Sequence, residues 1–175
     1  LSNKAADNMI SERSQQKIDD LYKNLQKKRP GVVGYPCNDS FDYSPLYKFL
    51  GMSLNNVGDP YSKSSYKLNT AEIEREVIDY FAKLVKAPED NFWGYCTNGG
   101  TEGNMYGLFL ARELYPDATF YYSQETHYSV QKLLKLLNVR SIMIRTQDDG
   151  RIDLEDLEET LRLNRQTIPV IVCNI

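Results

Sequence analysis

The chain has 175 residues, of which 41% are hydrophobic and 26% are charged, and its formal net charge is -3. This composition predicts a globular protein of one or two domains. A mildly acidic chain of mixed charge offers no basic surface for nucleic acid, and no apolar run approaches the ~18 residues that a membrane span needs.

The cysteines and the single histidine limit the chemistry further. Cys37, Cys96 and Cys173 are too few for a disulfide framework, which favours the reducing cytoplasm. With one histidine and no Cys-x-x-Cys pair, we expect no zinc site built from protein side chains. Residues 1–10 lack the basic and apolar regions of a signal peptide. These features predict a cytoplasmic protein without a metal site.

The first 90 residues are predicted to form helices and loops. An apolar stripe predicts an amphipathic helix that ends at Pro30-Gly31, and it consists of Ile18, Leu21, Tyr22 and Leu25. Such a stripe fits two alternatives equally well: the helix packs on its own domain, or it contacts another subunit. Ser44-Pro45 predicts the start of a short helix that reaches Asn55.

A longer helix is predicted after a polar segment. Residues 61–69 are rich in Ser, Lys and Tyr, and they form either a solvated connector or a loop at the mouth of a site. Asn69 or Thr70 caps the following helix, which ends before Pro88. Its apolar stripe consists of Ile73, Val77, Phe81 and Leu84.

From residue 92 onwards, strands and helices alternate. The predicted strands cover residues 92–96, 119–123, 141–146 and 168–173, and the predicted helices cover residues 101–114, 128–137 and 154–163. Alternation at this spacing indicates an α/β fold whose sheet is mainly parallel, with helices on both faces and right-handed connections. The apolar runs 142–144 and 170–172 fit strands that are buried on both sides.

A glycine-rich loop, residues 97–100, lies between the first predicted strand and its helix. Glycine allows positive φ and close approach of a ligand, and the first N–H groups of a helix have no carbonyl partner. Thr101 adds a hydroxyl at the helix start, and Glu102 suits the positive end of the helix dipole. The loop therefore predicts a phosphate site, although a tight connection without a ligand would use the same glycines. Its spacing fits neither a nucleotide P-loop nor Gly-x-Gly-x-x-Gly.

The only histidine, His127, lies in the loop after the predicted strand 119–123. Ligands of a parallel α/β sheet bind beyond the carboxyl ends of the strands, where this loop and the glycine loop are both expected. His127 is therefore either a flat ring near the ligand of the glycine loop or a surface residue at a helix start. Glu125 supports a rival interpretation, a nucleotide-binding Rossmann protein, because it lies about 20 residues beyond the glycine loop, where a ribose ligand belongs.

Two motifs together resemble a known family. Thr97-Asn98-Gly99-Gly100-Thr101-Glu102-Gly103-Asn104-Met105 and Thr126-His127-Tyr128-Ser129-Val130 are similar to motifs of the group II pyridoxal-phosphate-dependent amino-acid decarboxylases, and most similar to those of bacterial histidine decarboxylases. Phe41-Asp42-Tyr43 and Asn55-Asn56-Val57-Gly58-Asp59 also fit, so the resemblance covers residues 35–175. Pro60 and the Ser- and Tyr-rich loop after it are more similar to plant serine decarboxylases, which share the same overall pattern.

The resemblance implies an aspartate-aminotransferase-like large domain, of pyridoxal-phosphate fold type I, in a homodimer or higher homo-oligomer. It implies that residues 1–90 form a helical N-terminal segment with the dimer arm and the substrate mouth. Residues 91–175 would then form the first half of the cofactor-binding large domain.

The same resemblance implies roles for single residues. Gly100 and Thr101 would bind the phosphate of pyridoxal 5'-phosphate, and Asn174 would lie beside this cofactor. His127 would stack on the pyridine ring and contact the substrate. Asn56 and Asp59 would face the substrate mouth.

The implied activity is decarboxylation of a small L-amino acid, most directly L-histidine to histamine and CO2, with serine as the alternative substrate. The family's Schiff-base lysine, in a Ser-x-His-Lys context, and the aspartate that pairs with the pyridine nitrogen match no residue of this chain. We therefore expect a fragment that is inactive by itself. Two further alternatives are an NAD- or nucleotide-binding Rossmann protein and a truncated, cofactor-free paralogue that only dimerises.

Overall fold

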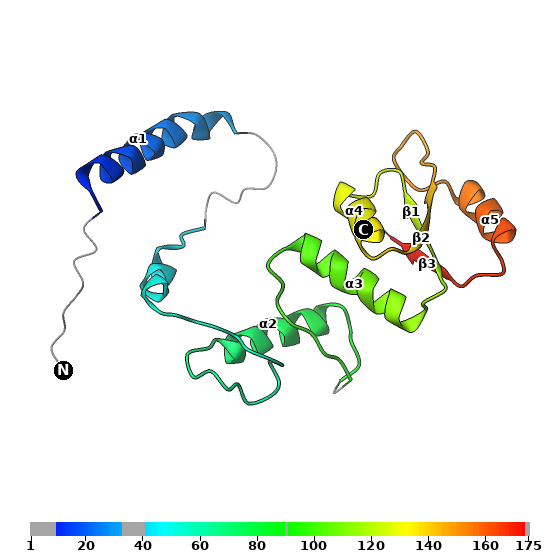
Figure 1. Ribbon diagram of the computed structural model, residues 1–175, viewed down its shortest axis with the longest axis horizontal. Helices are drawn as coiled ribbons and strands as arrows, with labels where there is room; N and C mark the ends of the chain where they lie inside the picture. Colours follow the sequence, from blue (N-terminus) through cyan, green and yellow to red (C-terminus); the bar gives the residue numbers. More distant parts are fainter. Residues whose placement is uncertain (1–9, 33–40, 90, 174–175) are drawn as a thin grey trace. The chain divides into compact units, whose positions relative to one another are not determined.

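The computed structural model describes residues 10–32, 41–89 and 91–173 (Figure 1). The chain divides into two compact units, Leu1–Met52 and Ser53–Ile175. The predicted site residues that the structure describes all lie in the second unit. The functional division expected near residue 90 stays a prediction.

In the first unit, the described residues form α1 (Glu12–Lys28) and two 3₁₀ helices, η1 (Arg29–Gly31) and η2 (Ser44–Gly51). The helix expected from Ser44 to Asn55 therefore begins where predicted, but it has 3₁₀ geometry and ends earlier. None of its side chains is buried, and without packing against an apolar face a short segment gains little from a longer α-helix.

The second unit begins with a loop and α2 (Ala71–Leu84). Of the two predicted caps, Asn69 and Thr70, it is Asn69 whose side chain makes a capping bond. Its Oδ1 accepts a hydrogen bond from the Ala71 N–H at 3.2 Å. After the helix, Lys86 adopts a positive φ of 57°, two residues before Pro88. The predicted apolar stripe is largely exposed, at 40 to 64% for Ile73, Val77, Phe81 and Leu84.

The strand predicted at residues 92–96 is wrong. A strand needs a neighbouring strand for its N–H and C=O groups, and this segment pairs with none of the described strands. The Cys96 N–H donates instead to Glu74 Oε1 of α2, at 2.8 Å. Aromatic rings attach the segment to α3, because Tyr106 lies edge-on to Tyr95 with ring centroids 5.2 Å apart.

The sheet is parallel, as predicted, in the order β2-β1-β3. Its strands are β1 (Thr119–Ser123), β2 (Arg140–Ile144) and β3 (Pro169–Val172). They alternate with α3 (Gly100–Leu114), α4 (Tyr128–Leu136) and α5 (Leu154–Leu163). The strand expected over 141–146 ends at Ile144, and Thr146 forms an isolated antiparallel bridge with Ile152 instead.

The two faces of β1 pack against different helices, because successive side chains of a strand point to opposite faces. Phe120 and Tyr122 contact a cluster from α3 and α4 that contains Leu108, Val130, Leu133 and Leu134. Tyr121 packs with Ile144 and Leu157, which belong to β2 and α5. Figure 1 shows α4 and α5 on opposite sides of the strands. The prediction of helices on both faces is confirmed.

Only β1 is buried along its whole length. Met143 of β2 is 51% exposed and Ile171 of β3 is 42% exposed. The expectation that residues 142–144 and 170–172 are buried on both sides is therefore wrong within the described structure. Each of these strands is an edge of the three-stranded sheet, and the helices cover an edge strand less completely than the central one.

Among the described residues, no helix combines the length and the apolar character that crossing a bilayer requires.

Candidate active site

The glycine loop leads directly into α3. Gly99 is the N-cap residue, and its φ of 160° and ψ of 171° describe an extended backbone. The positive φ expected in this loop is not found there, since the described glycines with positive φ are Gly58 and Gly150. Apart from the adjacent residues and the helix's own backbone, no described atom lies within 4 Å of the positions that Cβ atoms would take on Gly99 or Gly100. The missing side chains therefore leave open space above the helix start.

Three hydrogen-bond donors at this helix start have no acceptor among the described residues. The N–H groups of Glu102 and Gly103 donate to the Gly99 carbonyl, at 3.0 and 3.2 Å. The N–H groups of Gly100 and Thr101 and the Thr101 hydroxyl donate to no group among the described residues. The aligned peptide dipoles of a 15-residue helix add partial positive charge at this end. Such a set of donors suits an oxyanion.

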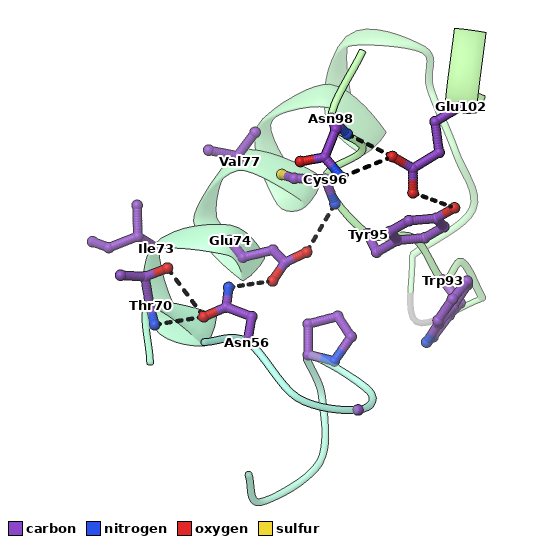
Figure 2. A pocket seen from close by; sticks show the side chains of 12 residues that line it. Asn56, Thr70, Ile73, Glu74, Val77, Trp93, Tyr95, Cys96, Asn98 and Glu102 are labelled. Carbon is purple, nitrogen blue, oxygen red and sulfur yellow. Dashed lines mark hydrogen bonds between the residues drawn. The ribbon is translucent and has the colours of Figure 1, made fainter. Parts of the chain in front are cut away.

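Glu102 folds back over the loop from the first turn of α3 (Figure 2). Its Oε2 accepts hydrogen bonds from the Asn98 backbone N–H at 2.8 Å and from Asn98 Nδ2 at 3.1 Å. Its Oε1 accepts a longer bond, 3.5 Å, from the Tyr95 hydroxyl. Burial, and then the nearby Glu102 carboxylate, raise the pKa of Tyr95. Tyr95 is therefore a neutral donor at physiological pH.

His127 is the N-cap residue of α4. Its Nδ1 accepts from the Ser129 N–H at 3.3 Å and lies 2.8 Å from the Ser129 hydroxyl. Because Nδ1 accepts these bonds, the proton of the neutral imidazole belongs on Nε2. The ring itself is exposed and lies 4.3 Å, between centroids, from the Tyr128 ring. His127 is thus an exposed residue at a helix start, and its place beside a ligand of the glycine loop stays a prediction.

The starts of α3 and α4 point towards the same edge of the sheet. Both helices pack on one face of β1. Arg112, in the last turn of α3, donates through its guanidinium to the Leu137 carbonyl just after α4, at 3.4 Å. Because the two helices end side by side, they run in the same direction. Thr101 and His127 therefore both belong to the carboxyl edge of β1, as the sequence predicted.

A pocket of about 600 Å³ lies between the loop before α2, α2 itself and the segment that leads to α3 (Figure 2). Its lining includes Asn56, Glu74, Trp93, Tyr95 and Glu102. The pocket brings the predicted substrate residue Asn56 to the base of the glycine loop. Gly100, Thr101 and His127 do not line this pocket.

Asn56 is held by the start of α2. Its Oδ1 accepts from the Thr70 N–H at 2.7 Å and from the Thr70 hydroxyl at 3.2 Å. Its Nδ2 donates to Glu74 Oε2, at 2.7 Å. These bonds occupy the acceptor oxygen and leave one Nδ2 hydrogen for a ligand.

Asp59 holds a turn against the only tryptophan of the chain. Its Oδ1 accepts from the Tyr61 N–H at 2.9 Å and from Trp93 Nε1 at 3.1 Å. The Tyr61 N–H, followed by the Trp93 indole, lowers the pKa of Asp59. Asp59 is therefore an ionised acceptor at neutral pH, with its carboxylate already engaged on two sides.

One predicted cofactor residue, Asn174, lies outside the described residues. Two site residues were not predictable in this role: Glu74 has no motif, and Glu102 was expected only to suit the helix dipole. Their carboxylates accept hydrogen bonds from the Cys96 and Asn98 N–H groups, in the segment before α3. Only the Glu102 bond has a local signal, because a Glu in the first helical turn often bonds the backbone just before the helix.

No family model matches the chain. Over 167 residues it is 44% identical to the histidine decarboxylase of Mesorhizobium japonicum, which covers 95% of this chain and 45% of that protein. The histidine decarboxylase of Morganella morganii is 44% identical over 166 residues, which covers 95% of this chain and 44% of that protein. The chain therefore spans less than half the length of these curated relatives.

Solved structures extend the comparison to the fold. L-methionine decarboxylase from Streptomyces sp. 590 matches with a TM-score of 0.80 and 24% identity, over 93% of this chain and 43% of that one. Kynurenine aminotransferase from Pyrococcus horikoshii matches with a TM-score of 0.50 and 15% identity, over 96% of this chain and 43% of that one. The expected aspartate-aminotransferase-like fold is confirmed for the part that the chain spans.

The two motifs that first indicated the decarboxylases thus agree with the similarity of almost the whole chain. The alignment with these relatives extends well beyond the glycine loop and the His127 motif, since it covers 95% of the chain. The chain is therefore a homologue of the histidine decarboxylases, over nearly all of its own length and under half of theirs.

Proposed function

We propose that the protein carrying this chain decarboxylates an L-amino acid with the help of pyridoxal 5'-phosphate, and that L-histidine is its substrate. The observation that carries the proposal is the set of unpaired donors at the start of α3, in a chain 44% identical to proteins named histidine decarboxylase. The reaction products are then histamine and CO2.

A phosphate group fits the start of α3. The N–H groups of Gly100 and Thr101 and the Thr101 hydroxyl are the three donors that would hold it, and the absence of Cβ atoms on Gly99 and Gly100 gives it room. When bound, the pyridine ring of the cofactor accepts the electrons that remain on Cα after CO2 leaves. The helix start thus serves as the anchor that fixes the cofactor's orientation.

His127 supplies the second contact in this proposal. Its imidazole would pack on the pyridine ring and touch the substrate. Ser129 holds Nδ1 and so limits rotation of the imidazole. The family resemblance assigns Asn174 to the cofactor, and it assigns Asn56 and Asp59 to the substrate mouth. The lysine that binds the cofactor lies outside these 175 residues, since none of their lysines stands in a Ser-x-His-Lys context.

We further propose a cytoplasmic homodimer or higher homo-oligomer. Residues 1–90 provide the dimer arm and the substrate mouth, and residues 91–175 provide the first half of the cofactor-binding domain. The exposed apolar stripe of α1 supports the arm, because a helix with no buried residue gains stability from a partner surface. The free cysteines Cys96 and Cys173 support a reducing compartment.

A serine decarboxylase is the second candidate. One observation favours it, namely Pro60 after Asp59 together with the Ser- and Tyr-rich residues 61–66. Pro60 is buried, and its carbonyl accepts a 2.7 Å hydrogen bond from Arg75 Nη1, so this loop has a fixed place beside the pocket.

The test is a substrate comparison with the purified protein that carries this chain. We expect a visible absorption band on addition of pyridoxal 5'-phosphate, and CO2 release from L-histidine that exceeds release from L-serine. Faster release from L-serine would favour the second candidate. Binding of NAD without pyridoxal phosphate would support a Rossmann protein instead. A dimer that binds neither compound would be a non-catalytic paralogue.

A further inference from the structure

We propose that Glu102 is the positioning residue of the phosphate loop: its carboxylate holds Asn98, and this keeps the free N–H groups of Gly100 and Thr101 aimed at one point. The inference rests on the proposed function, since it deepens the role given to the start of α3. Glu102 would contact no cofactor atom and would act through the loop backbone.

The two glycines of the loop bring no side chains that would fix its shape. Gly99 and Gly100 have no side chains that pack against the rest of the protein, and both are exposed. Glycine has more backbone freedom than any other residue, so the loop needs an external restraint to hold one shape. Glu102 supplies it from the first turn of α3, with two hydrogen bonds to Asn98 at 2.8 and 3.1 Å.

The residues before the loop are held by other contacts. Glu74 accepts the Cys96 N–H at 2.8 Å, which attaches this part of the chain to α2. The Thr97 hydroxyl donates to the Gly99 carbonyl at 3.1 Å. Between the Glu74 contact and the helix, the Asn98 backbone N–H is anchored by Glu102 alone. Loss of the Glu102 side chain therefore releases Asn98, while the Glu74–Cys96 and Thr97–Gly99 bonds remain.

The negative charge of Glu102 would by itself act against phosphate binding. A carboxylate near a helix start opposes the binding of a phosphate dianion, because like charges repel. Positioning and charge therefore predict opposite effects when Glu102 is removed. If Glu102 acts only through its charge, its removal strengthens phosphate binding. If it positions the loop, its removal weakens binding.

Four variants of the protein that carries this chain separate these effects. We expect Glu102→Ala to raise the dissociation constant for pyridoxal 5'-phosphate about tenfold, the loss expected when a charged hydrogen-bond acceptor is removed. Glu102→Asp keeps the charge but is one methylene shorter, and it should weaken binding too. Glu102→Gln keeps an oxygen for the Asn98 N–H and should bind at least as tightly as wild type. Glu113→Ala, on the same helix, is the matched control and should leave the dissociation constant for pyridoxal 5'-phosphate unchanged.

Two further measurements distinguish positioning from general instability. Affinity for pyridoxal, which lacks the phosphate, should be the same in wild type and Glu102→Ala. Amide hydrogen exchange at Asn98 should be faster in Glu102→Ala and unchanged in Glu113→Ala. Equal or tighter binding of the phosphate cofactor by Glu102→Ala and Glu102→Asp would overturn the inference. If wild type itself fails to bind the cofactor, the proposed function has failed, and this inference with it.

Discussion

Thr101 lies where a ligand would need it, because its hydroxyl and its N–H have no partner among the described residues. We expect Thr101→Ala to weaken binding of pyridoxal 5'-phosphate by about 1 to 2 kcal/mol, the order of magnitude of a lost hydrogen bond to a charged group. Thr101→Ser, which keeps the hydroxyl, should bind as wild type does. Titration of the visible absorption band measures both affinities. Unchanged affinity in the alanine variant would remove the phosphate role of this hydroxyl.

His127 combines a structural and a functional task, which a single alanine variant confounds. As the N-cap of α4 it accepts from the Ser129 N–H, and loss of such a cap costs about 0.5 to 2 kcal/mol of stability. We expect His127→Ala to lower the decarboxylation rate far more than this stability loss explains.

Asparagine separates the two tasks of His127, because it caps helices well but has no ring. His127→Asn should melt near the wild-type temperature and still lose decarboxylation. Rate assays and thermal melts run in parallel decide the outcome. A variant with normal turnover per folded molecule would make His127 purely structural.

Among the elements, those with local signals were predictable from the sequence. Helix α5 occupies the predicted residues, because Asp153 caps it by accepting from the N–H groups of Glu155 and Asp156. Strand β1 was equally clear, since an apolar and aromatic run between two helices fits a buried central strand. The start of α3 followed from the glycine loop.

Long-range contacts were not predictable from the sequence. Residues 92–96 have the composition of a strand, but whether a strand forms depends on a pairing partner elsewhere. Here Glu74, 22 residues earlier in the chain, takes the Cys96 N–H instead. Asn56 was assigned to the substrate from resemblance alone, and its bonds to Thr70 and Glu74 span 14 and 18 residues. No local pattern reveals contacts of this kind.

The Trp93 indole N–H donates a hydrogen bond to the Asp59 carboxylate. Protonation of this carboxylate at low pH should weaken the bond. The N–H of Tyr61 and then the Trp93 indole lower the pKa of Asp59. A carboxylate with a depressed folded pKa contributes stability above its unfolded pKa, and this contribution is lost as the pH falls through the folded pKa. We expect Trp93 fluorescence in this chain to change at a pH below the usual aspartate pKa.

Asp59→Asn is the control for this titration, since asparagine keeps an oxygen for both donors but does not ionise. Far-UV circular dichroism followed in parallel reports acid unfolding. A fluorescence change of the same midpoint and size in Asp59→Asn would show that Asp59 is not the titrating group.

At the scale of the whole molecule, apolar surface is distributed unevenly. The sheet unit buries the side chains of β1 on both faces, whereas α1 buries none of its residues. Its stripe of Ile18, Leu21, Tyr22 and Leu25 is 51 to 62% exposed. Its helical conformation is supported locally, by Ser11 and by Gln–Asp pairs one turn apart.

We therefore expect the α1 stripe to contribute to the proposed homodimer. The double variant Leu21→Ala, Leu25→Ala keeps helix propensity but removes apolar surface, and it should weaken dimer association by on the order of 3 kcal/mol. Lys23→Ala, on the same helix but outside the stripe, is the matched control. Sedimentation velocity over a range of protein concentrations measures the association. If the double variant dimerises as tightly as the control, the stripe is not the dimer arm, and α1 packs within its own subunit instead.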